Sequence, residues 1–467
     1  MSLSGGSNSE DAVQQAIESL SAVSLKEDAA QQSAKSSSPA SSMNPALSSM
    51  NESMFAVTVG KERIAFNGFS EAKAVLPLTL ACQMFAKFAE HVASDSEPDS
   101  IHMNFAEQFS SHIGKRYQLE KQRTDMLLTL LGQYYGGRFT KEGLSMNCIA
   151  VPGGSTDISV FEKYDMQFYI NFELKLKQNK QVNPLLQNAT YFLYSKSICS
   201  YLITITNAGI RICGALLLPV TGGTQAVVSY LTPLYGYHDT KRIAKAFEGI
   251  MKFLPELKLM RSQPIASILD ALPKLDTNED TYDYCDRLDD TKLVFLANRS
   301  SDNKQCIVKF VEKYGENVHR YLFRKGLAPE LYDILESVRG SWKAIIMELL
   351  PGTSLHSLHD TDMDNEKIRK IIDCLRNIKK TLQGSHYVHG DLRPNNLIVT
   401  SDFNVVKVVD FDWAGEESKV SYPLNLNTID IAWASGVEPC RPITKKHDSW
   451  MLDCEIKHLP TILPTAN

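Results

Sequence analysis

Residues 389–396 read His-Gly-Asp-Leu-Arg-Pro-Asn-Asn, and residues 408–413 read Val-Val-Asp-Phe-Asp-Trp. Phosphoryl transfer requires a carboxylate that orients the attacking hydroxyl group and ligands that hold Mg²⁺ on the nucleotide phosphates. Asp391 can supply the carboxylate, and Asn396 and Asp410 can supply the metal ligands. The two stretches therefore predict a phosphotransferase that uses ATP and Mg²⁺.

The fixed separations within these stretches resemble the HxDxxxxN loop and the DFG-type segment of protein kinases and related phosphotransferases. His389 opens this loop, and Arg393 stands where protein kinases keep a lysine, so it can neutralise developing charge. Two further positions depart from the protein-kinase pattern: Gly390 replaces an arginine, and Asp412 replaces the glycine. His-Gly-Asp is the form found in aminoglycoside and choline kinases, which leaves a small-molecule acceptor open beside a protein acceptor.

Two apolar runs upstream, residues 293–296 and 306–310, predict neighbouring strands. Within the second run, Lys309 follows the β-branched residues Ile307 and Val308, where kinases keep the lysine that binds the nucleotide phosphates. Glu316 is the expected ion-pair partner of this lysine, and Glu312 is the alternative.

Residues 345–352, Ile-Ile-Met-Glu-Leu-Leu-Pro-Gly, resemble a kinase hinge. We expect the backbone of Glu348 and Leu349 to contact adenine. No glycine occurs between Asp286 and Lys309, so the sequence lacks the glycine-rich phosphate loop of protein kinases. Downstream, the segment Asp-Ser-Trp at 448–450 resembles the one that anchors the catalytic loop in kinase C-lobes.

A second group of charged residues lies in the middle of the chain. The sequence predicts a β-hairpin that carries Asp157 on one strand and Glu173 and Lys175 on the other. Glu173 and Lys175 are two positions apart and therefore face the same side. Two carboxylates beside a lysine can hold Mg²⁺ and activate water for phosphodiester hydrolysis. The same spacing also occurs in hairpins that merely carry surface charge.

This hairpin resembles the D…ExK core of restriction-endonuclease-like nucleases. Gln187 and Tyr191 match the QxxxY pattern of the following helix, and Glu120 is a candidate acid on the preceding helix. The resemblance implies Asp157 and Glu173 as metal ligands and nucleic acid as the partner. Nearby basic residues are candidates for phosphate contacts: Arg116, Lys121, Arg123, Lys177 and Lys180.

The chain divides into four predicted segments. Residues 1–54 are serine-rich and are expected to be disordered, because 16 serines and no aromatic residue precede Phe55. Residues 55–255 form the predicted nuclease-like domain, 256–285 a linker, and 286–467 the kinase-like domain. The expected fold class is α/β plus α+β, with a restriction-endonuclease-like αβββαβ core followed by a two-lobed protein-kinase-like domain.

Residues 410–415, Asp-Phe-Asp-Trp-Ala-Gly, together with Tyr422-Pro423 and His447-Asp448, resemble a fungal and oomycete protein-kinase-like family. That family often forms the C-terminal half of Crinkler-type effector proteins, which combine it with a nuclease-like module. The resemblance covers roughly residues 100–455. It implies a protein Ser/Thr kinase-like enzyme with a nucleic-acid-binding module. The alternatives are a small-molecule kinase of the aminoglycoside or choline type and a non-catalytic pseudokinase scaffold.

Composition excludes some classes of protein. With 49 Lys+Arg against 54 Asp+Glu, the net charge of −5 argues against a protein that coats nucleic acid along its whole length. The nine cysteines include no CxxC pair, which favours a reducing compartment. No apolar run approaches the roughly 20 residues of a membrane span. We therefore expect a cytoplasmic or nuclear protein without a membrane partner, or one secreted into a host cell without a recognisable signal peptide.

Overall fold

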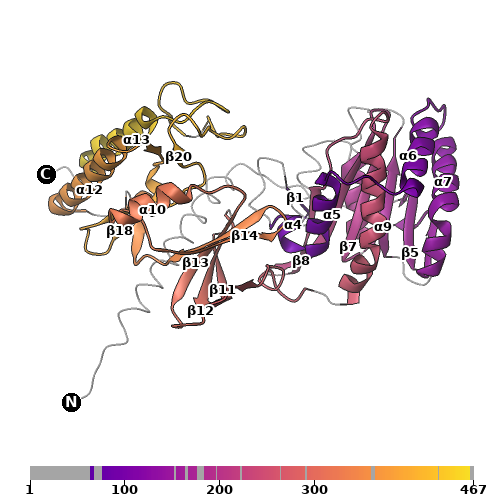
Figure 1. The fold of residues 1–467 in the computed structure, drawn as a ribbon, viewed down its shortest axis with the longest axis horizontal. Coiled ribbons are helices and arrows are strands. Elements are labelled where there is room, and N and C mark those ends of the chain that lie inside the picture. Colours follow the sequence, from indigo (N-terminus) through magenta and orange to yellow (C-terminus); the bar gives the residue numbers. More distant parts are fainter. Residues whose placement is uncertain are drawn as a thin grey trace, which may run out of the picture. The chain divides into compact units, whose positions relative to one another are not determined.

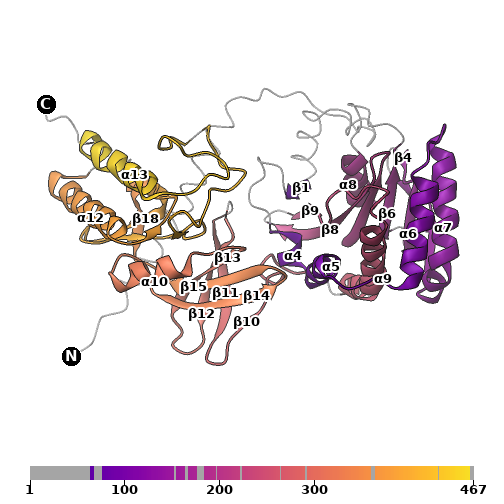
Figure 2. The same cartoon turned by 45° about the horizontal axis from the view of Figure 1, so that its top comes forward.

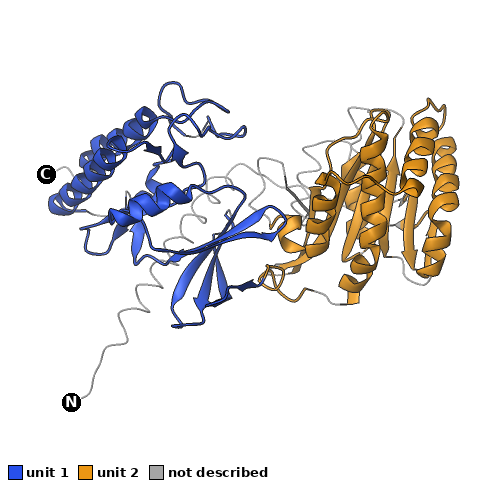
Figure 3. Ribbon diagram, viewed as in Figure 1, with its two compact units in different colours: residues 1–35, 274–467 blue, residues 36–273 orange. Residues whose placement is uncertain are grey.

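The structure is a computed structural model that describes residues 64–67, 76–151, 154–162, 167–175, 184–195, 197–220, 223–262, 265–289, 292–358, 363–429 and 431–462. The predicted serine-rich tail lies outside these residues. The described chain forms two compact units, one ending at Pro273 and the other beginning at Lys274 (Figure 3). No helix in the described part of the chain is long and apolar enough to cross a membrane.

A seven-stranded sheet forms the centre of the first unit (Figure 1). Its order is β1 (Ile64–Asn67), β9 (Gly223–Tyr230), β8 (Ile210–Val220), β7 (Cys199–Ile205), β6 (Phe168–Leu174), β5 (Ile158–Glu162) and β2 (Leu144–Asn147). The pairs β6–β7 and β1–β9 are parallel, and the other neighbours are antiparallel. A short hairpin, β3 (Ala150–Val151) and β4 (Gly154–Ser155), lies outside this sheet.

Helices cover both faces of the sheet. They are α4 (Leu78–Ala81), α5 (Gln83–Ala93), α6 (Ser100–Ile113), α7 (Glu120–Lys141), α8 (Pro184–Ser195) and α9 (Thr240–Ser262). Successive strand residues point to opposite faces. The side-chain amide of Asn171 in β6 donates to Oδ1 of Asn188 in α8, whereas the ring of the next residue, Phe172, stacks against Phe247 of α9. The helices α8 and α9 therefore lie on opposite faces, and every residue of β6 and β7 is buried.

The second unit begins with a six-stranded antiparallel sheet (Figure 2). Its order is β10 (Leu275–Asp276), β11 (Thr281–Asp289), β12 (Val294–Arg299), β13 (Gln305–Val311), β15 (Trp342–Glu348) and β14 (Leu331–Arg339). Helix α10 (Glu316–Arg324) follows β13 and precedes β14, so the sheet and this helix form one lobe.

The rest of this unit consists of helices and short strands. Its elements are β16 (Gly352–Ser354), α11 (Leu355–Leu358), α12 (Asn365–Gln383), β17 (Tyr387–Val388), η1 (Pro394–Asn396), β18 (Leu397–Thr400), β19 (Val406–Val408), β20 (Gly415–Glu416), α13 (Lys445–His458) and η2 (Leu459–Ile462). The apolar face of α12 packs in a core with Leu392, Leu397 and Phe411. This core therefore supports the loops that carry the predicted catalytic residues.

The structure divides the predicted linker, residues 256–285, between the two units. Its first part continues α9 to Ser262, past Pro255, and its last part forms β10 and the beginning of β11. Residues 276–280, an acidic stretch typical of a linker, form the turn of this hairpin, in which the N–H of Thr277 donates to the carbonyl of Asp280 at 2.7 Å. Polar turn residues have the same composition in a tight hairpin as in a linker, so composition could not separate the two.

Candidate functional site

The predicted catalytic residues of the second unit lie around the hairpin formed by β18 and β19. Asn396 precedes β18 and Asp410 follows β19, and these strands pair antiparallel, so the two residues lie at the same end. The N–H of Val409 donates to the carbonyl of Asn396 at 3.0 Å and joins the two segments. Asp391 lies in the loop between β17 and β18. Hairpin pairing thus brings together three residues that span twenty positions of sequence.

The glycine of His-Gly-Asp has a backbone reason. Gly390 has φ 86°, a left-handed conformation that residues with a Cβ rarely adopt, and a Cβ there would lie 2.8 Å from Cδ1 of Ile443. The N–H groups of His389 and Gly390 donate to the two carboxylate oxygens of Asp448 at 2.6 and 2.8 Å. Burial raises the pKa of Asp448 to about 7, although these two donors act in the opposite direction. An arginine at position 390 would break this arrangement.

Asp391 is buried, and neighbouring donors hold its carboxylate. Arg393 makes a bidentate contact with it, at 2.5 Å from Nε and 2.8 Å from Nη2. The amide nitrogen of Asn396 donates to Oδ2 of Asp391 at 2.9 Å. We expected Arg393 to face the transferred phosphate, but the structure places its guanidinium on the catalytic carboxylate. The amide oxygen of Asn396 has no partner among the described residues, so it can act as a ligand.

Lys309 is the centre of a buried charge cluster. Its Nζ lies 2.6 Å from Oδ1 of Asp410 and 2.6 Å from Oδ1 of Asp412. Lys292, in the turn between β11 and β12, lies 3.2 Å from Oδ2 of Asp410. Asp410 itself has φ 71°.

Burial disfavours the charged forms of Lys309, Asp410 and Asp412, but opposite charges outweigh burial in setting the pKa of Lys309 and of Asp410. Burial lowers the pKa of Lys309, yet Asp410 and Asp412 outweigh it and raise that pKa. Burial likewise opposes ionisation of Asp410, but Lys309 and Lys292 hold its pKa well below the usual range. For Asp412, burial and the neighbouring Asp410 prevail and raise the pKa.

The predicted partner of Lys309 was wrong. Glu316 lies on α10 and pairs with Arg320 of the same helix, at 2.7 Å, and both side chains are more than two-fifths exposed. The alternative, Glu312, is exposed and has no ion pair with Lys309. The structure instead gives this role to Asp410 and Asp412. In the sequence, Asp412 is visible only as a departure from the DFG pattern. Its acidic side chain is the signal that could have identified it as a partner of Lys309.

A packed aromatic group supports the segment that carries these aspartates. Phe411 is buried between the rings of His319, stacked at 4.5 Å, and His389, at 5.2 Å. Burial lowers the pKa of His319 to about 4, so this imidazole is neutral at physiological pH. A backbone bond from the N–H of Gly315 to the carbonyl of Phe411, at 2.8 Å, ties the segment to the start of α10.

One cavity joins the catalytic loop to the predicted hinge. It is lined by Lys309, Asn396 and Asp410 at one side and by Met347, Glu348 and Leu349 at the other. The lining of the hinge side is mostly apolar, which suits a flat base. The N–H of Glu348 already donates to the carbonyl of Glu330 at 2.9 Å, so adenine would have to use other backbone groups of the hinge.

The first unit brings its predicted residues together as well. Ile158 lies opposite Phe172, so Asp157 and Glu173 meet across the β5–β6 ladder, and Oδ2 of Asp157 accepts the N–H of Leu174 at 2.7 Å. Glu173 is 1% exposed.

Few contacts offset the free-energy cost of burying the carboxylate of Glu173. Its Oε1 lies 2.9 Å from Nζ of Lys175, but neither carboxylate oxygen accepts a hydrogen bond of good geometry from the described residues. Burial, together with the nearby carboxylate of Asp157, raises the pKa of Glu173 to about 8. Glu120, at the start of α7, lies 3.8 Å from the same lysine. Such buried and unsatisfied carboxylates are unusual unless a site requires them.

The surrounding residues differ in their roles. Gln187 donates to the hydroxyl of Tyr191 at 2.6 Å on α8. Arg123 is not a phosphate contact: it is fully buried, and its guanidinium donates to Ile113, Lys175, Thr206, Asn207 and Tyr237. Arg116 and Lys121 are exposed. The other two candidates, Lys177 and Lys180, lie outside the described residues.

Comparison with known proteins identifies the second unit only. A family model of the RIO domain, an atypical protein-kinase family, matches residues 277–418, which include Lys309, Asp391, Asn396 and Asp410. Among solved structures, the kinase PK-1 of Cydia pomonella granulovirus is similar, with 16% identity, a TM-score of 0.31, and coverage of 40% of this chain and 71% of that chain. No curated protein matches the chain. The unit that begins at Lys274 contains a protein-kinase-like domain, which confirms the prediction made from its catalytic loop.

Proposed function

We propose that this protein is an ATP-dependent phosphotransferase of the protein Ser/Thr kinase type. The observation that carries the proposal is the convergence of Lys309, Asn396 and Asp410 on a single cavity, with the carboxylate of Asp391 hydrogen-bonded to the amide of Asn396. These are the cation, the carboxylate and the metal ligands that phosphoryl transfer needs.

The residues fit a hard divalent cation. Asp410 stays ionised because two lysines hold its pKa low, and the amide oxygen of Asn396 is unused by the described residues. Mg²⁺ prefers oxygen ligands of this kind. When bound, it supplies positive charge that neutralises the nucleotide phosphates. Binding of such an ion would weaken the contacts of Asp410 with its two lysines, Lys292 and Lys309.

The chain's own residues account for the other tasks. Asp391 is held in place by Arg393 and Asn396, so its carboxylate can orient the acceptor hydroxyl and take up its proton. Lys309, once Asp410 turns to the metal, stays paired with Asp412 and can direct its ammonium towards the phosphates. Lys292 lies in the turn where protein kinases place a glycine-rich loop, and it supplies a further cation.

Phosphate transfer from labelled ATP tests this proposal. Purified full-length protein would be incubated with a protein mixture, with aminoglycosides and with choline in separate reactions. Transfer to protein supports the proposal, whereas transfer only to a small molecule supports the alternative acceptor. Asp391→Asn is the matched control, because it keeps the shape of the side chain and removes the carboxylate. If neither acceptor class is labelled and ATP with Mg²⁺ does not bind, the protein is a non-catalytic scaffold.

We propose a second activity for the first unit, a metal-dependent nuclease-like module that contacts nucleic acid. Three observations support it: the buried Glu173 without good hydrogen bonds, its proximity to Asp157 and Lys175, and the element order α7-β2-β5-β6-α8-β7 with β6 parallel to β7. The short hairpin β3–β4 is inserted between β2 and β5, and the order of the other elements supports the αβββαβ core that the sequence predicts. Nicking of DNA or RNA with Mg²⁺ or Mn²⁺, lost in Glu173→Gln, is the expected result. Absence of both binding and nicking in the wild type would refute it.

The combination of a kinase-like unit with a nuclease-like unit also supports a Crinkler-type effector role. On that reading the protein acts in the cytoplasm or nucleus of a host cell. Loss of the biological effect in Asp391→Asn or Glu173→Gln would show which activity it requires. An undiminished effect in both variants would favour a scaffold.

A further inference from the structure

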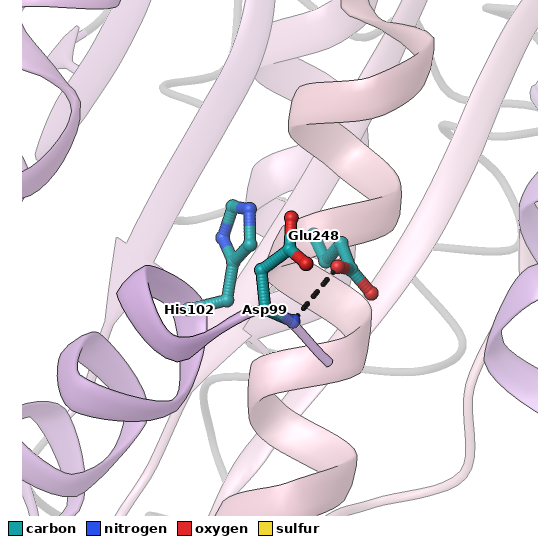
Figure 4. Close-up of side chains that lie close together, drawn as sticks. All are labelled: Asp99, His102 and Glu248. Atoms are coloured by element: carbon teal, nitrogen blue, oxygen red, sulfur yellow. Dashed lines mark hydrogen bonds between the residues drawn. The ribbon is translucent and has the colours of Figure 1, made fainter. Parts of the chain in front are cut away.

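A third cluster of titratable residues lies in the first unit and is distinct from the Asp157–Glu173 pair. Asp99, His102 and Glu248 each offer a ligand atom, and these atoms lie within 4.8 Å of one another. Figure 4 shows the three side chains converging from the start of α6 and from the middle of α9. Among the described residues, this is the only group of three or more His, Cys, Asp or Glu side chains with such spacing.

The side chain of Asp99 does not cap the helix at whose N-terminus it stands. It stands at the N-cap of α6, where an aspartate normally accepts a backbone N–H of the first turn, yet its side chain makes no such bond. Its own N–H donates instead to Oε1 of Glu248 at 3.0 Å, which is the dashed contact in Figure 4. The backbone thereby fixes Glu248 beside the cluster, and the carboxylate of Asp99 remains available.

The histidine is oriented as metal-binding histidines are. His102 is 7% exposed, and its Nδ1 lies 3.0 Å from the hydroxyl of Tyr135. Its Nε2 has no hydrogen-bond partner among the described residues, although two carboxylates are close. A neutral ring whose Nδ1–H donates to Tyr135 carries its lone pair on Nε2, and such a second contact is typical of ligating histidines.

A second histidine adjoins the same carboxylate. Nε2 of His91 lies 3.0 Å from Oε2 of Glu248, but it is buried without a hydrogen bond of good geometry. The cluster therefore holds two carboxylates and the imidazole of His102, whose Nε2 has no hydrogen-bond partner among the described residues, and His91 contacts Glu248 from outside the cluster. A cation within the cluster would contact this nitrogen and relieve the repulsion between the carboxylates.

We propose that Asp99, His102 and Glu248 bind a divalent transition-metal ion, best matched by Zn²⁺, with His91 as a supporting contact of Glu248. A mixed set of imidazole and carboxylate ligands suits Zn²⁺ and disfavours Mg²⁺ and Ca²⁺, which prefer oxygen alone. Ligand bonds of about 2.0–2.2 Å require the side chains to draw together, and the exposed Asp99 can move to allow this. The ion would join α6 to α9, which are far apart in sequence.

Equilibrium dialysis of the full-length protein against Zn²⁺, with Mg²⁺ in excess to occupy oxygen-only sites, tests the proposal. The variants are Asp99→Asn and Glu248→Gln, which keep side-chain shape, and the control is His112→Ala, because His112 also lies on α6 but outside the cluster. We expect the wild type and the control to bind one more equivalent of Zn²⁺ than either variant. Zn²⁺ bound by surface cysteines is common to all four proteins and cancels in the comparison.

Two further measurements distinguish Zn²⁺ binding at this site from nonspecific binding. Zn²⁺ should raise the melting temperature of the wild type and the control, but not of Asp99→Asn, since only a native site links binding to stability. Co²⁺ should give ligand-field absorption in the wild type that His102→Gln lacks. Because the side chain of Asp99 caps nothing, Asp99→Asn is expected to fold normally. Equal Zn²⁺ equivalents in the wild type and Asp99→Asn, or no Zn²⁺ bound by the wild type, would overturn the assignment.

Discussion

Replacement of Asp412 by asparagine tests whether this residue positions Lys309 during phosphoryl transfer. Lys309 has two carboxylate partners, each at 2.6 Å, and Asp410 is needed for Mg²⁺. With the metal bound, Asp412 is left as the charged partner that holds the lysine. A charge-assisted hydrogen bond contributes about 1.5–3 kcal/mol, which corresponds to roughly a 10- to 150-fold change in rate. Because the Asp412 side chain is 33% exposed, we expect the lower part of this range.

The matched control is Glu316→Gln. Kinase resemblance assigns the role to Glu316, whereas the structure pairs Glu316 with Arg320 on an exposed surface, where an ion pair contributes at most about 1 kcal/mol. Steady-state ATP turnover or autophosphorylation by the full-length protein would be measured for both variants. We expect Asp412→Asn to lower kcat/KM for ATP about 10-fold or more, and Glu316→Gln to change it less than about 2-fold.

The opposite pattern would refute the reasoning. A large loss in Glu316→Gln with a small loss in Asp412→Asn would mean that α10 moves to give Lys309 its usual kinase partner. Loss of folding would be a trivial cause, so the melting temperature of each variant accompanies the rates. All four tryptophans lie at or after position 342, so their fluorescence reports the unfolding of the kinase-like unit alone.

Three other outcomes follow from the structure. Because burial raises the pKa of Glu173 from 4.5 to about 8, the folded protein retains a proton that the unfolded chain has lost between these pH values. The free energy of unfolding of the first unit should therefore fall by about 1.4 kcal/mol per pH unit across this window. Metal-free urea titrations followed by circular dichroism should show this slope in the wild type but not in Glu173→Gln, and the same slope in both proteins would contradict the prediction. Gly390→Ala should lower the melting temperature of the kinase-like unit by more than Gly326→Ala does. Both glycines have positive φ, and the backbone strain of an alanine there costs about 1–3 kcal/mol, but only at position 390 does the added Cβ lie within 3 Å of a neighbour, Ile443. Equal melting temperatures of the two variants would exclude a steric contribution from Ile443. Arg393→Lys should lower kcat about 10-fold at nearly constant KM, because lysine cannot make the bidentate contact with the catalytic carboxylate; an unchanged kcat would argue against that role.

Local motifs carried much of the sequence-based prediction. The spacing of Asp391, Asn396 and Asp410 was informative because one short hairpin separates them, and hairpin pairing depends on nearby residues. The proximity of Asp157 and Glu173 could be predicted from the sequence for the same reason, because the two residues lie on paired strands of one hairpin. The need for glycine at 390 was visible as a departure, but its cause, a positive φ beside Ile443, required the backbone.

Other features depended on contacts between distant segments. Lys309 pairs with aspartates about a hundred positions away, and no local pattern ranks them against Glu316, which lies only seven positions on. The sequence offers Arg123 as a candidate phosphate contact, yet the fold surrounds its guanidinium with buried carbonyls. The turn at Thr277–Asp280 resembled a linker because linkers and tight turns use the same residues.

Sequence alone was sufficient for the class of chemistry in the kinase-like unit, because phosphoryl transfer needs particular side chains at short, fixed separations. It was also sufficient to place a second pair of carboxylates on one hairpin. Tertiary structure decided which charges compensate one another: Asp412 rather than Glu316 at Lys309, and the meeting of Asp99 and His102 with Glu248. The physical reason is that electrostatic energy depends on distance and burial in space. Neither quantity is encoded in the spacing of residues along the chain.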